Sequence, residues 1–364
     1  MSQHTPLPKS SQPLVNWTDP GREAAFHQWL DRIRDTHGLQ PASLRLASAD
    51  ASFRRYLRID TPQSGTGSLI IMDAPPDKED SRPFVKVAAL MSRAGLNVPQ
   101  VLDWEPATGF LLLADLGSLT MMEAIDANDA DANQSLYLRA VDALVLWQSA
   151  SRTGVLPAYD EALLARELSL FPDWYLQRHR GVVVEGAMRQ TLNDQFKLIV
   201  ERNLAAPAVY VHRDFMPRNL MVPGESETRL GVLDFQDAVH GPITYDIASL
   251  MRDAFLSWDE EFVLDITVRY WQRAQKAGLP VDSDFGEFYR AVEWMGLQRH
   301  LKVAGIFARL GLRDGKPRYL ADAPRFIAYI RATTSRYREL APLLRLLDQV
   351  EGTQAPSAYA FGRV

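Results

Sequence analysis

The sequence of 364 residues predicts a bilobal α+β protein, with a small antiparallel-sheet N-terminal lobe and a larger helical C-terminal lobe. Two patterns support this prediction. Short runs with strand-like alternation fill residues 43–114, whereas long amphipathic segments with helical spacing fill most of 136–347. The periodicity changes at Asp115-Leu-Gly-Ser, which we interpret as a hinge. The expected divisions are a disordered lead-in at 1–20, the N-terminal lobe at 21–114, the C-terminal lobe at 115–350 and a tail at 351–364.

The N-terminal lobe is expected to begin with a helix, because Thr18-Asp-Pro-Gly is a typical helix start. The apolar face of this helix consists of Phe26, Trp29, Leu30 and Ile33. Strands are predicted at 44–46, 53–59, 69–72, 98–104 and 110–114, with one helix at 82–93.

The C-terminal lobe is expected to be mostly helical. Its amphipathic segments lie at 136–153, 161–179, 192–204, 261–277, 285–310 and 319–347. Between the third and fourth of them, residues 207–234 alternate short apolar strands with polar loops, and the last strand ends on Asp234.

The composition is that of a globular protein rather than a specialised class. Apolar residues make up 46% and charged residues 23% of the chain. The net charge of −5 and the absence of a basic run argue against general nucleic-acid binding. There is no cysteine, no signal-peptide pattern and no apolar stretch long enough to span a membrane. We therefore expect a cytoplasmic protein that binds neither nucleic acid nor membrane.

The most informative motif is Val211-His-Arg-Asp-Phe-Met-Pro-Arg-Asn219, which contains the pattern H-R-D-x-x-x-x-N. This pattern and a later Asp-Phe at Asp234 are typical of the catalytic loop and metal-binding segment of kinase-like phosphotransferases. Asp214 is the expected acceptor of a hydroxyl proton, and Asn219 and Asp234 the expected Mg²⁺ ligands in transfer from ATP. Asp and Asn more often cap turns, but the strand–loop–strand arrangement around both motifs favours the catalytic interpretation.

These motifs resemble those of the aminoglycoside phosphotransferase family. The likeness covers the catalytic run and the segment from Val232 through Gly241 to Leu250, in which Asp246 would anchor the loop from behind. Membership would imply the bilobal protein-kinase-like fold. The stretch Phe110–Gly117 is similar to the family's hinge, where Leu113 and Asp115 would bind ATP.

Further stretches are similar to the bacterial N-acetylmuramate/N-acetylglucosamine anomeric kinases. They are 50–56, 72–76, 171–179, 234–239 and 298–310. This resemblance implies phosphorylation of the C1 hydroxyl of a free amino sugar, in the recycling of peptidoglycan sugars. Two alternatives stay open: another small-molecule kinase, acting on an aminoglycoside, choline or homoserine, and a nucleotide-binding pseudokinase.

The pseudokinase alternative arises because the expected phosphate-binding lysine is missing from the third strand, where Met72 stands instead. Arg54, Arg55 or Lys86 is expected to supply the positive charge. The preceding loop has no glycine, and Ser48 and Ser52 are its candidate ATP contacts.

The amino sugar is expected on the C-terminal side of Asp214, and the protein is expected to act as a monomer. Aromatic rings suit the apolar face of a pyranose, and arginine suits a carboxylate. Arg218 is a candidate catalytic residue near the transferred group, although a surface ion pair explains it equally well. The candidate substrate contacts are Trp174, Tyr175, Arg178, His179, Gln236, Asp237, Arg299 and His300.

Overall fold

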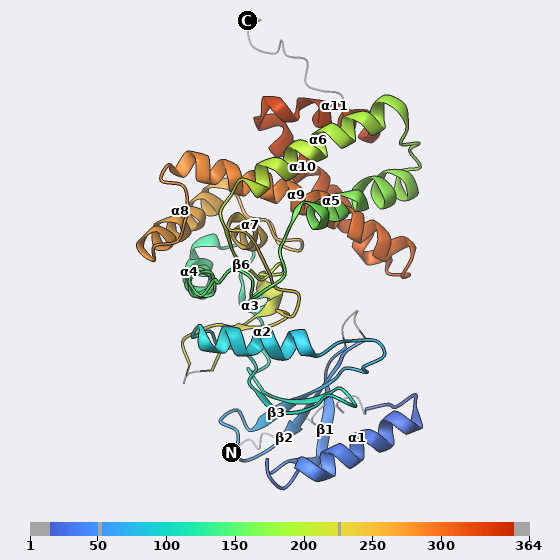
Figure 1. The fold of residues 1–364 in the computed structure, drawn as a ribbon, viewed down its shortest axis with the longest axis vertical. Helices are drawn as coiled ribbons and strands as arrows, with labels where there is room; N and C mark the ends of the chain where they lie inside the picture. The colour runs from blue at the N-terminus through green and yellow to red at the C-terminus, as the bar shows by residue number, and fades with distance from the viewer. Residues whose placement is uncertain (1–14, 50–52, 225–226, 353–364) are drawn as a thin grey trace, which may run out of the picture. The chain divides into compact units, whose positions relative to one another are not determined.

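The computed structural model describes residues 15–49, 53–224 and 227–352, which divide into two compact units. The first unit comprises the described residues up to Thr120 together with Met221–Asp237, and the second comprises Met121–Leu220 and the residues from Ala238 onward. A sheet unit and a helical unit confirm the predicted α+β class (Figure 1). The first unit also takes in Met221–Asp237, which lies inside the stretch 115–350 that the sequence assigns to one lobe.

The first unit is built on a five-stranded antiparallel sheet with the strand order β1-β2-β3-β5-β4. Strand β5 therefore lies between β3 and β4, and the chain leaves the sheet directly after it. The strands are β1 (Gln40–Ala49), β2 (Arg55–Asp60), β3 (Ser68–Asp73), β4 (Val101–Glu105) and β5 (Phe110–Ala114).

Two helices cover opposite sides of this sheet (Figure 1). Helix α1 (Pro20–Ile33) starts at Asp19, whose carboxylate accepts the N–H of Gly21 at 2.8 Å. The predicted apolar face of α1 packs on alternate residues of β2, β3 and β5, which form one hydrophobic core. Helix α2 (Arg82–Arg93) has the predicted bounds and buries Phe84, Val87, Ala88 and Met91.

The segment Met221–Asp237 joins this unit through short strands. Strand β8 (Gly231–Val232) pairs with β7 (Leu220–Met221), and the N–H of Val232 donates to the carbonyl oxygen of Asn97 at 2.8 Å. These bonds hold Asp234, two residues after β8, in the sheet unit.

The second unit is a helical assembly around the 28-residue helix α9 (Phe285–Leu312), most of whose middle residues are buried. Gly305 allows close packing there, because a Cβ at this position would lie 2.4 Å from the carbonyl carbon of Leu170. The other helices are α3 (Met121–Ala124), α4 (Ala130–Ser149), α5 (Glu161–Leu170), α6 (Gly186–Leu204), α7 (Thr244–Met251), α8 (Glu260–Lys276), α10 (Ala323–Arg336) and α11 (Ala341–Glu351).

Two of the long helices predicted from periodicity are interrupted. The segment predicted at 161–179 continues from α5 as a π-helix, η1 (Phe171–His179), where Pro172 has no N–H to give to an α-helical ladder. The segment predicted at 319–347 divides into 3₁₀ turns and two helices, and prolines stand in the first turns of both α10 and α11. The 3₁₀ turns are η3 (Pro317–Asp322) and η4 (Arg338–Leu340).

Strand β6 (Ala208–Val211) leads into the H-R-D motif and pairs antiparallel with β9 (Val239–Pro242). The 3₁₀ turn η2 (Pro217–Asn219) ends the motif, and α7 follows β9. In the part of the chain that the structure describes, no helix is long and apolar enough to cross a membrane.

Candidate catalytic site

The H-R-D motif forms a loop whose backbone is bonded from both sides of Asp214. The N–H of Asp214 donates to Nδ1 of His212 at 3.2 Å, which requires that this ring nitrogen carry no proton. The side-chain amide of Asn219 donates to the carbonyl oxygen of Asp214 at 2.9 Å. The fully buried His212 and the turn at Asn219 therefore hold the half-buried Asp214 in a defined place.

This loop contains a strained residue that a buried carboxylate stabilises. Arg213 has a φ of 79°, in the left-handed region that costs a non-glycine residue free energy. The carboxylate of Asp246 on α7 accepts the N–H groups of His212 at 2.7 Å and Arg213 at 3.0 Å. Asp246 is wholly buried, and burial raises its pKa to about 6 against the opposing effects of His212, Arg213 and Arg299.

The second acidic motif is strained as well. Asp234 has a φ of 62°, and Arg213 and Asp234 are the two non-glycine residues with positive φ in the described ranges. Nε2 of Gln236 donates to Oδ1 of Asp234 at 2.7 Å. The intervening Phe235 is buried and its ring lies 4.9 Å from that of Phe84 on α2. Backbone strain at these two motifs, and nowhere else among the described non-glycine residues, is typical of functional positions.

The sheet unit carries an arginine in the surroundings of Asp234. Arg54 forms an ion pair with Glu79 at 3.1 Å, and both side chains are largely buried. Burial raises the pKa of Tyr56; the positive charge of Arg54 opposes this shift, and the negative charge of Asp234 adds to it. Arg54 and Asp234 therefore both influence the pKa of Tyr56. Met72, at the position of the missing lysine, is buried and pairs in register with Tyr56.

The other predicted arginine has a different environment. Arg55 donates to Asp73 at 2.6 Å and lies over the ring of Trp17, with its guanidinium carbon 4.1 Å from the ring centroid. Arg22 binds the second oxygen of the same buried carboxylate. Arg55 thus belongs to an ion-pair cluster that joins α1 to the sheet. Lys86 lies on α2.

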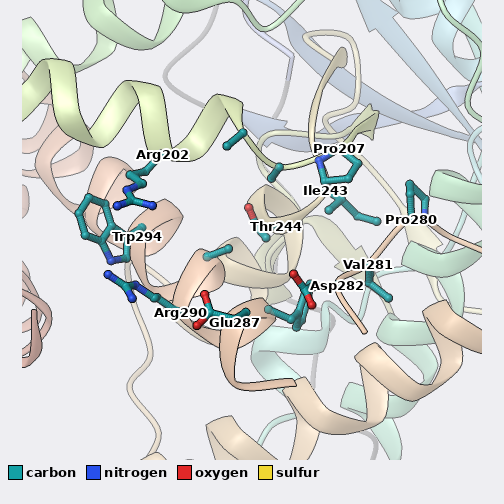
Figure 2. Close-up of a pocket in the computed structure, with 14 residues that line it drawn as sticks. Arg202, Pro207, Ile243, Thr244, Pro280, Val281, Asp282, Glu287, Arg290 and Trp294 are labelled. Carbon is teal, nitrogen blue, oxygen red and sulfur yellow. The ribbon is translucent and has the colours of Figure 1, made fainter. Parts of the chain in front are cut away.

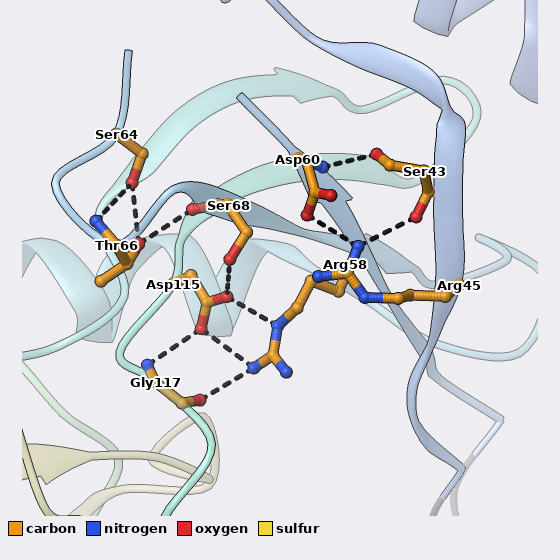
Figure 3. Close-up of polar contacts among 9 residues, drawn as sticks. All are labelled: Ser43, Arg45, Arg58, Asp60, Ser64, Thr66, Ser68, Asp115 and Gly117. Carbon is orange, nitrogen blue, oxygen red and sulfur yellow. Dashed lines mark hydrogen bonds and ion pairs between the residues drawn. The ribbon is translucent and has the colours of Figure 1, made fainter. Parts of the chain in front are cut away.

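The two predicted hinge residues differ in their contacts. Leu113 is buried in β5 between β3 and β4. Asp115 accepts hydrogen bonds from Arg58 at 2.7 Å, from the hydroxyl of Ser68 at 2.6 Å and from the N–H of Gly117 at 2.9 Å (Figure 3). This network fixes the backbone where the chain leaves β5. Of the predicted serines, Ser48 pairs through β1 with Tyr56, and Ser52 lies outside the described residues.

Four of the predicted sugar contacts lie on η1. Arg178 stacks on Trp174, with 4.0 Å between the guanidinium carbon and the ring centroid. The hydroxyl of the buried Tyr175 donates to Glu351 at 2.9 Å, and its ring lies 5.4 Å from that of His179. The bond from Tyr175 to Glu351 joins η1 to the end of α11, whereas the other two contacts lie within η1.

Arg299 and His300 on α9 are both buried. The ring of His300 stacks on Tyr329 of α10 at 4.6 Å, and burial lowers its pKa well below the usual value. The guanidinium carbon of Arg299 lies 5.4 Å from the centroid of the Tyr245 ring. Burial raises the pKa values of Asp246 and Asp253, and the positive charge of Arg299 partly opposes both shifts. Arg299 thus lies behind the catalytic loop, with contacts different from those of the η1 group.

The remaining predicted residues flank the two motifs. Gln236 binds Asp234, as described above, and Asp237 is exposed at the end of the same segment. Arg218 is directed to Phe255, with 4.8 Å between its guanidinium carbon and the ring centroid. Burial raises the pKa of Asp253 to about 6, and the positive charge of Arg218 partly opposes this shift.

Sequence reasoning missed a buried cluster behind the loop. Glu167 on α5 accepts from Arg213 at 2.7 Å and pairs with Lys302 of α9 at 2.8 Å. Glu167 lies on the amphipathic helix α5, and no sequence motif around it marks it as a functional residue. Lys302 falls inside the stretch 298–310 that carries the anomeric-kinase resemblance, which was the available signal.

The helical unit also contains a cavity of about 530 Å³, which lies between the end of α6, the start of α7 and the first half of α9. Arg202 and Trp294 lie on one side of it and Asp282 on another, with Thr244 between them (Figure 2). None of the residues predicted as site residues lines this cavity.

The donor atoms of the two motifs suit Mg²⁺. The amide nitrogen of Asn219 donates to the carbonyl oxygen of Asp214, and an amide oxygen is among the atoms that Mg²⁺ binds. Asp234 adds an exposed carboxylate. No cluster of three or more His, Cys, Asp or Glu side chains suited to a metal occurs among the described residues. Mg²⁺ is often bound by one or two protein oxygens, with nucleotide phosphates and water completing its coordination.

Comparison with solved structures gives the fold. An ethanolamine kinase of Plasmodium vivax superposes with a TM-score of 0.59 at 11% identity, covering 94% of each chain. A choline kinase of Streptococcus pneumoniae superposes with a TM-score of 0.56, also at 11% identity, covering 85% of this chain and 99% of the other. At such low identity the likeness concerns the fold alone, and it confirms the predicted kinase-like architecture.

Comparison with known sequences gives closer relatives. A protein of Pseudomonas aeruginosa named N-acetylmuramate/N-acetylglucosamine kinase is 49% identical over 93% of this chain and 100% of its own. A protein of the same name from Neisseria meningitidis is 47% identical over 92% of this chain and 97% of its own. The model of the phosphotransferase enzyme family matches residues 43–281, more than half of the chain. The chain therefore belongs to the phosphotransferase enzyme family.

Proposed function

We propose that this protein is an ATP-dependent anomeric kinase that phosphorylates the C1 hydroxyl of N-acetylmuramate and N-acetylglucosamine. The observation that carries the proposal is the H-R-D loop, in which Asp214 is bonded through its backbone on both sides and the strained Arg213 is stabilised by Asp246. The choice of acceptor rests on the two relatives of that name, which this chain matches over nearly its whole length.

In the proposed reaction the C1 oxygen of the sugar forms a bond to the γ-phosphorus of ATP. The bond from that phosphorus to the β,γ-bridging oxygen breaks, and the products are the sugar 1-phosphate and ADP. Asp214 orients the hydroxyl and accepts its proton late in the transfer, because the transition state is loose and little negative charge develops early on the attacking oxygen. An anomeric hydroxyl is more acidic than an ordinary alcohol, so a carboxylate suffices as the base.

Asn219 and Asp234 are the proposed Mg²⁺ ligands. When bound, the cation would neutralise phosphate charge during the transfer. Arg54 is the proposed phosphate-binding cation of the sheet unit, because its pair with Glu79 joins a basic and an acidic residue, as the lysine–glutamate pair of other kinases does. The predicted contacts Leu113 and Asp115 remain part of the ATP proposal, with Asp115 fixing the hinge backbone.

The sugar contacts remain proposals as well. Gln236 and Asp237 follow the proposed metal ligand directly. Trp174 and Arg178 expose part of their surface, whereas Arg299 and His300 are buried and would act by supporting the loop. We further propose a monomer that works in the cytoplasm, where ATP is available; sedimentation analysis tests the oligomeric state.

The decisive experiment is incubation with ATP, Mg²⁺ and a panel of acceptors, with ADP release as the readout and ³¹P NMR to locate the phosphate. We expect ADP release with both amino sugars and a C1 phosphate ester, and none with their 1-deoxy analogues. Turnover with choline, homoserine or an aminoglycoside alone would contradict the sugar assignment. Binding of ATP without turnover on any acceptor would indicate a pseudokinase.

A further inference from the structure

The cavity of the helical unit has the size and the kind of lining that small-molecule sites have. Its volume of about 530 Å³ falls within the ~300–1,000 Å³ typical of such sites. Most of the side chains that line it are apolar, and Ile243 and Phe288 among them are buried. A cavity of this kind binds a ligand through apolar area, and a few polar groups fix the orientation of the ligand.

Two buried polar groups of the lining lack a partner. Trp294 of α9 and Thr244 of α7 expose 2% and 1% of their surface, and Thr244 lies in the middle of the lining residues (Figure 2). Nε1 of Trp294 and Oγ1 of Thr244 have no hydrogen-bond partner among the described residues. The Thr244 hydroxyl makes no capping bond to α7, and an indole N–H can only donate. Because an unpaired buried donor costs free energy, both groups favour a ligand that brings acceptor atoms.

A cation lies at the same end of the cavity as the indole. Arg202, in the last turn of α6, has its guanidinium carbon 5.9 Å from the centroid of the Trp294 ring. Arg290 gathers at this end as well (Figure 2), but its guanidinium pairs with Glu339. Arg202 forms no ion pair within the described part of the chain. This end therefore offers one cation and one N–H donor to an acceptor that carries negative charge.

The charges of the lining favour a ligand with a single negative charge. Arg202 and Arg290 are balanced by Asp282 and Glu287, so the four ionisable residues of the lining sum to zero. A carboxylate adds one negative charge, whereas a phosphate monoester adds about 1.5 to 2 at pH 7 and would be repelled more strongly by the two carboxylates. The apolar side chains suit a short hydrocarbon body.

We propose that this cavity is a second binding site, separate from the H-R-D loop, for a small organic monocarboxylate. The carboxylate of the ligand binds Arg202 and accepts from the indole N–H of Trp294. The hydroxyl of Thr244 donates to a second oxygen of the ligand, and the hydrocarbon body packs on the apolar lining. The proposal does not depend on the proposed kinase activity.

The first test uses 4-methylpentanoate and its amide, 4-methylpentanamide, which has nearly the same shape and no charge. Both are titrated into the full-length protein by calorimetry, with saturation-transfer NMR to detect weak binding. We expect the carboxylate to bind at least about tenfold more tightly than the amide. Equal affinities, or no binding of the carboxylate up to about 20 mM, overturn the proposal. Displacement of the carboxylate by equimolar inorganic phosphate would overturn the choice of ligand class.

The second test locates the bound carboxylate with Arg202→Met and the control Lys197→Met. Lys197 is an exposed cation of the same helix, and it pairs with Glu201 rather than lining the cavity. Arg202→Met should weaken the carboxylate about tenfold and the amide less than about twofold, because only the charged ligand loses a partner. Lys197→Met should leave both affinities unchanged. Equal weakening in the two variants would mean a general effect of surface charge and would overturn the site.

The third test, Thr244→Val, separates binding from damage to the fold. The variant loses a buried hydroxyl that has no partner among the described residues, so the melting temperature of the free protein should equal or exceed that of wild type. The ligand loses a hydrogen bond, so its affinity should fall about three- to tenfold and the rise in melting temperature that it causes should shrink. A carboxylate bound at the H-R-D loop would be insensitive to this variant and to Arg202→Met, which would contradict the proposal.

Discussion

The loop around Asp214 and the surroundings of Arg54 are stabilised in different ways. Around Asp214, side chains bind backbone groups: His212 and Asn219 bind the main chain of Asp214, and Asp246 binds two consecutive N–H groups. In the sheet unit, ion pairs between side chains dominate, such as that of Arg54 with Glu79.

The difference indicates which part tolerates change. A backbone held in a strained conformation requires each partner in place, because losing one leaves a buried donor without an acceptor. An ion pair requires only that opposite charges meet, and a different residue can supply either one. The proposed use of Arg54, which directly precedes β2, in place of a lysine on β3 is consistent with this freedom, while the H-R-D pattern is complete.

The strongest test of the loop is Asp214→Ala. Removing the proposed base should lower kcat about 1,000-fold or more, since general bases contribute between about 10² and 10⁴ in rate. ATP affinity, measured by calorimetry, should stay within about threefold of wild type. A large loss of ATP binding with little loss in the rate of transfer would assign Asp214 to the nucleotide instead.

The matching test of the sheet unit is Arg54→Met, with Arg55→Met as the control. A charge-assisted phosphate contact contributes about 1.5–3 kcal/mol, so Arg54→Met should raise KM for ATP between about 10- and 100-fold. Arg55 is engaged with Asp73 and Trp17, so Arg55→Met should lower the melting temperature and leave KM for ATP nearly unchanged.

The opposite pattern, in which Arg55→Met weakens ATP binding and Arg54→Met only lowers the melting temperature, would identify Arg55 as the phosphate ligand. Equal effects of both variants on KM would mean that neither arginine alone replaces the lysine.

The strained turn is tested by Asp246→Asn. An asparagine presents one acceptor oxygen and one N–H₂ donor to two backbone donors, so one buried N–H loses its partner. We expect a loss of about 2–3 kcal/mol in the free energy of unfolding by urea, together with a lower kcat. Asp348→Asn, which changes an ion pair far from the loop in sequence, should cost less than about 1 kcal/mol.

How far the sequence could predict these features depends on how local they are. Strand-like apolar runs predicted the sheet, and helical spacing of apolar residues predicted α1. Buried residues alternate in β2, whereas β3 and β5 bury most of theirs. The H-R-D spacing identified the candidate loop, since all its residues lie within one nine-residue run. Arg54 was one of three candidates for the phosphate-binding cation. Its pairing with Glu79 distinguishes it from Arg55, which pairs with Asp73, and such contacts cannot be read from a sequence.

The cluster around Glu167 could not be predicted in this way. Glu167, Arg213 and Lys302 come from α5, the loop and α9, and no periodicity relates them. A charged residue on an amphipathic helix is most often exposed, so Glu167 carried no sign of burial. The same limit applies to the interruption of the helix predicted at 161–179: periodicity cannot separate a π-helix from an α-helix over nine residues.

The smallest expected effect is a pH dependence that separates activity from stability. Asp246 has a pKa of about 6 because burial outweighs its hydrogen bonds, so it becomes protonated as the pH falls from 7 to 5. A protonated carboxyl loses one of its two acceptors, and the turn at Arg213 relaxes. We expect kcat to fall about tenfold between pH 7 and pH 5, with a midpoint near 6.

Stability should respond in the opposite direction in this window. The pKa of Asp246 is higher in the folded protein than its ordinary value of 3.8, so the folded state binds the proton more tightly. This group therefore adds stability as the pH falls from 7 to 5, by linkage. Carboxyls with lowered pKa values, such as Glu260, stay ionised there and contribute little change. A melting temperature that falls along with kcat would attribute the acid limb to unfolding rather than to the loop.

Asp253 provides the control, because burial raises its pKa to about 6 as well and its carboxylate accepts the N–H of Phe255. In Asp253→Asn the acid limb of kcat should keep its midpoint, since Asp246 still titrates. If the limb disappears in that variant, the titrating group lies beside Arg218 and Phe255, and the strain at Arg213 is insensitive to the charge of Asp246.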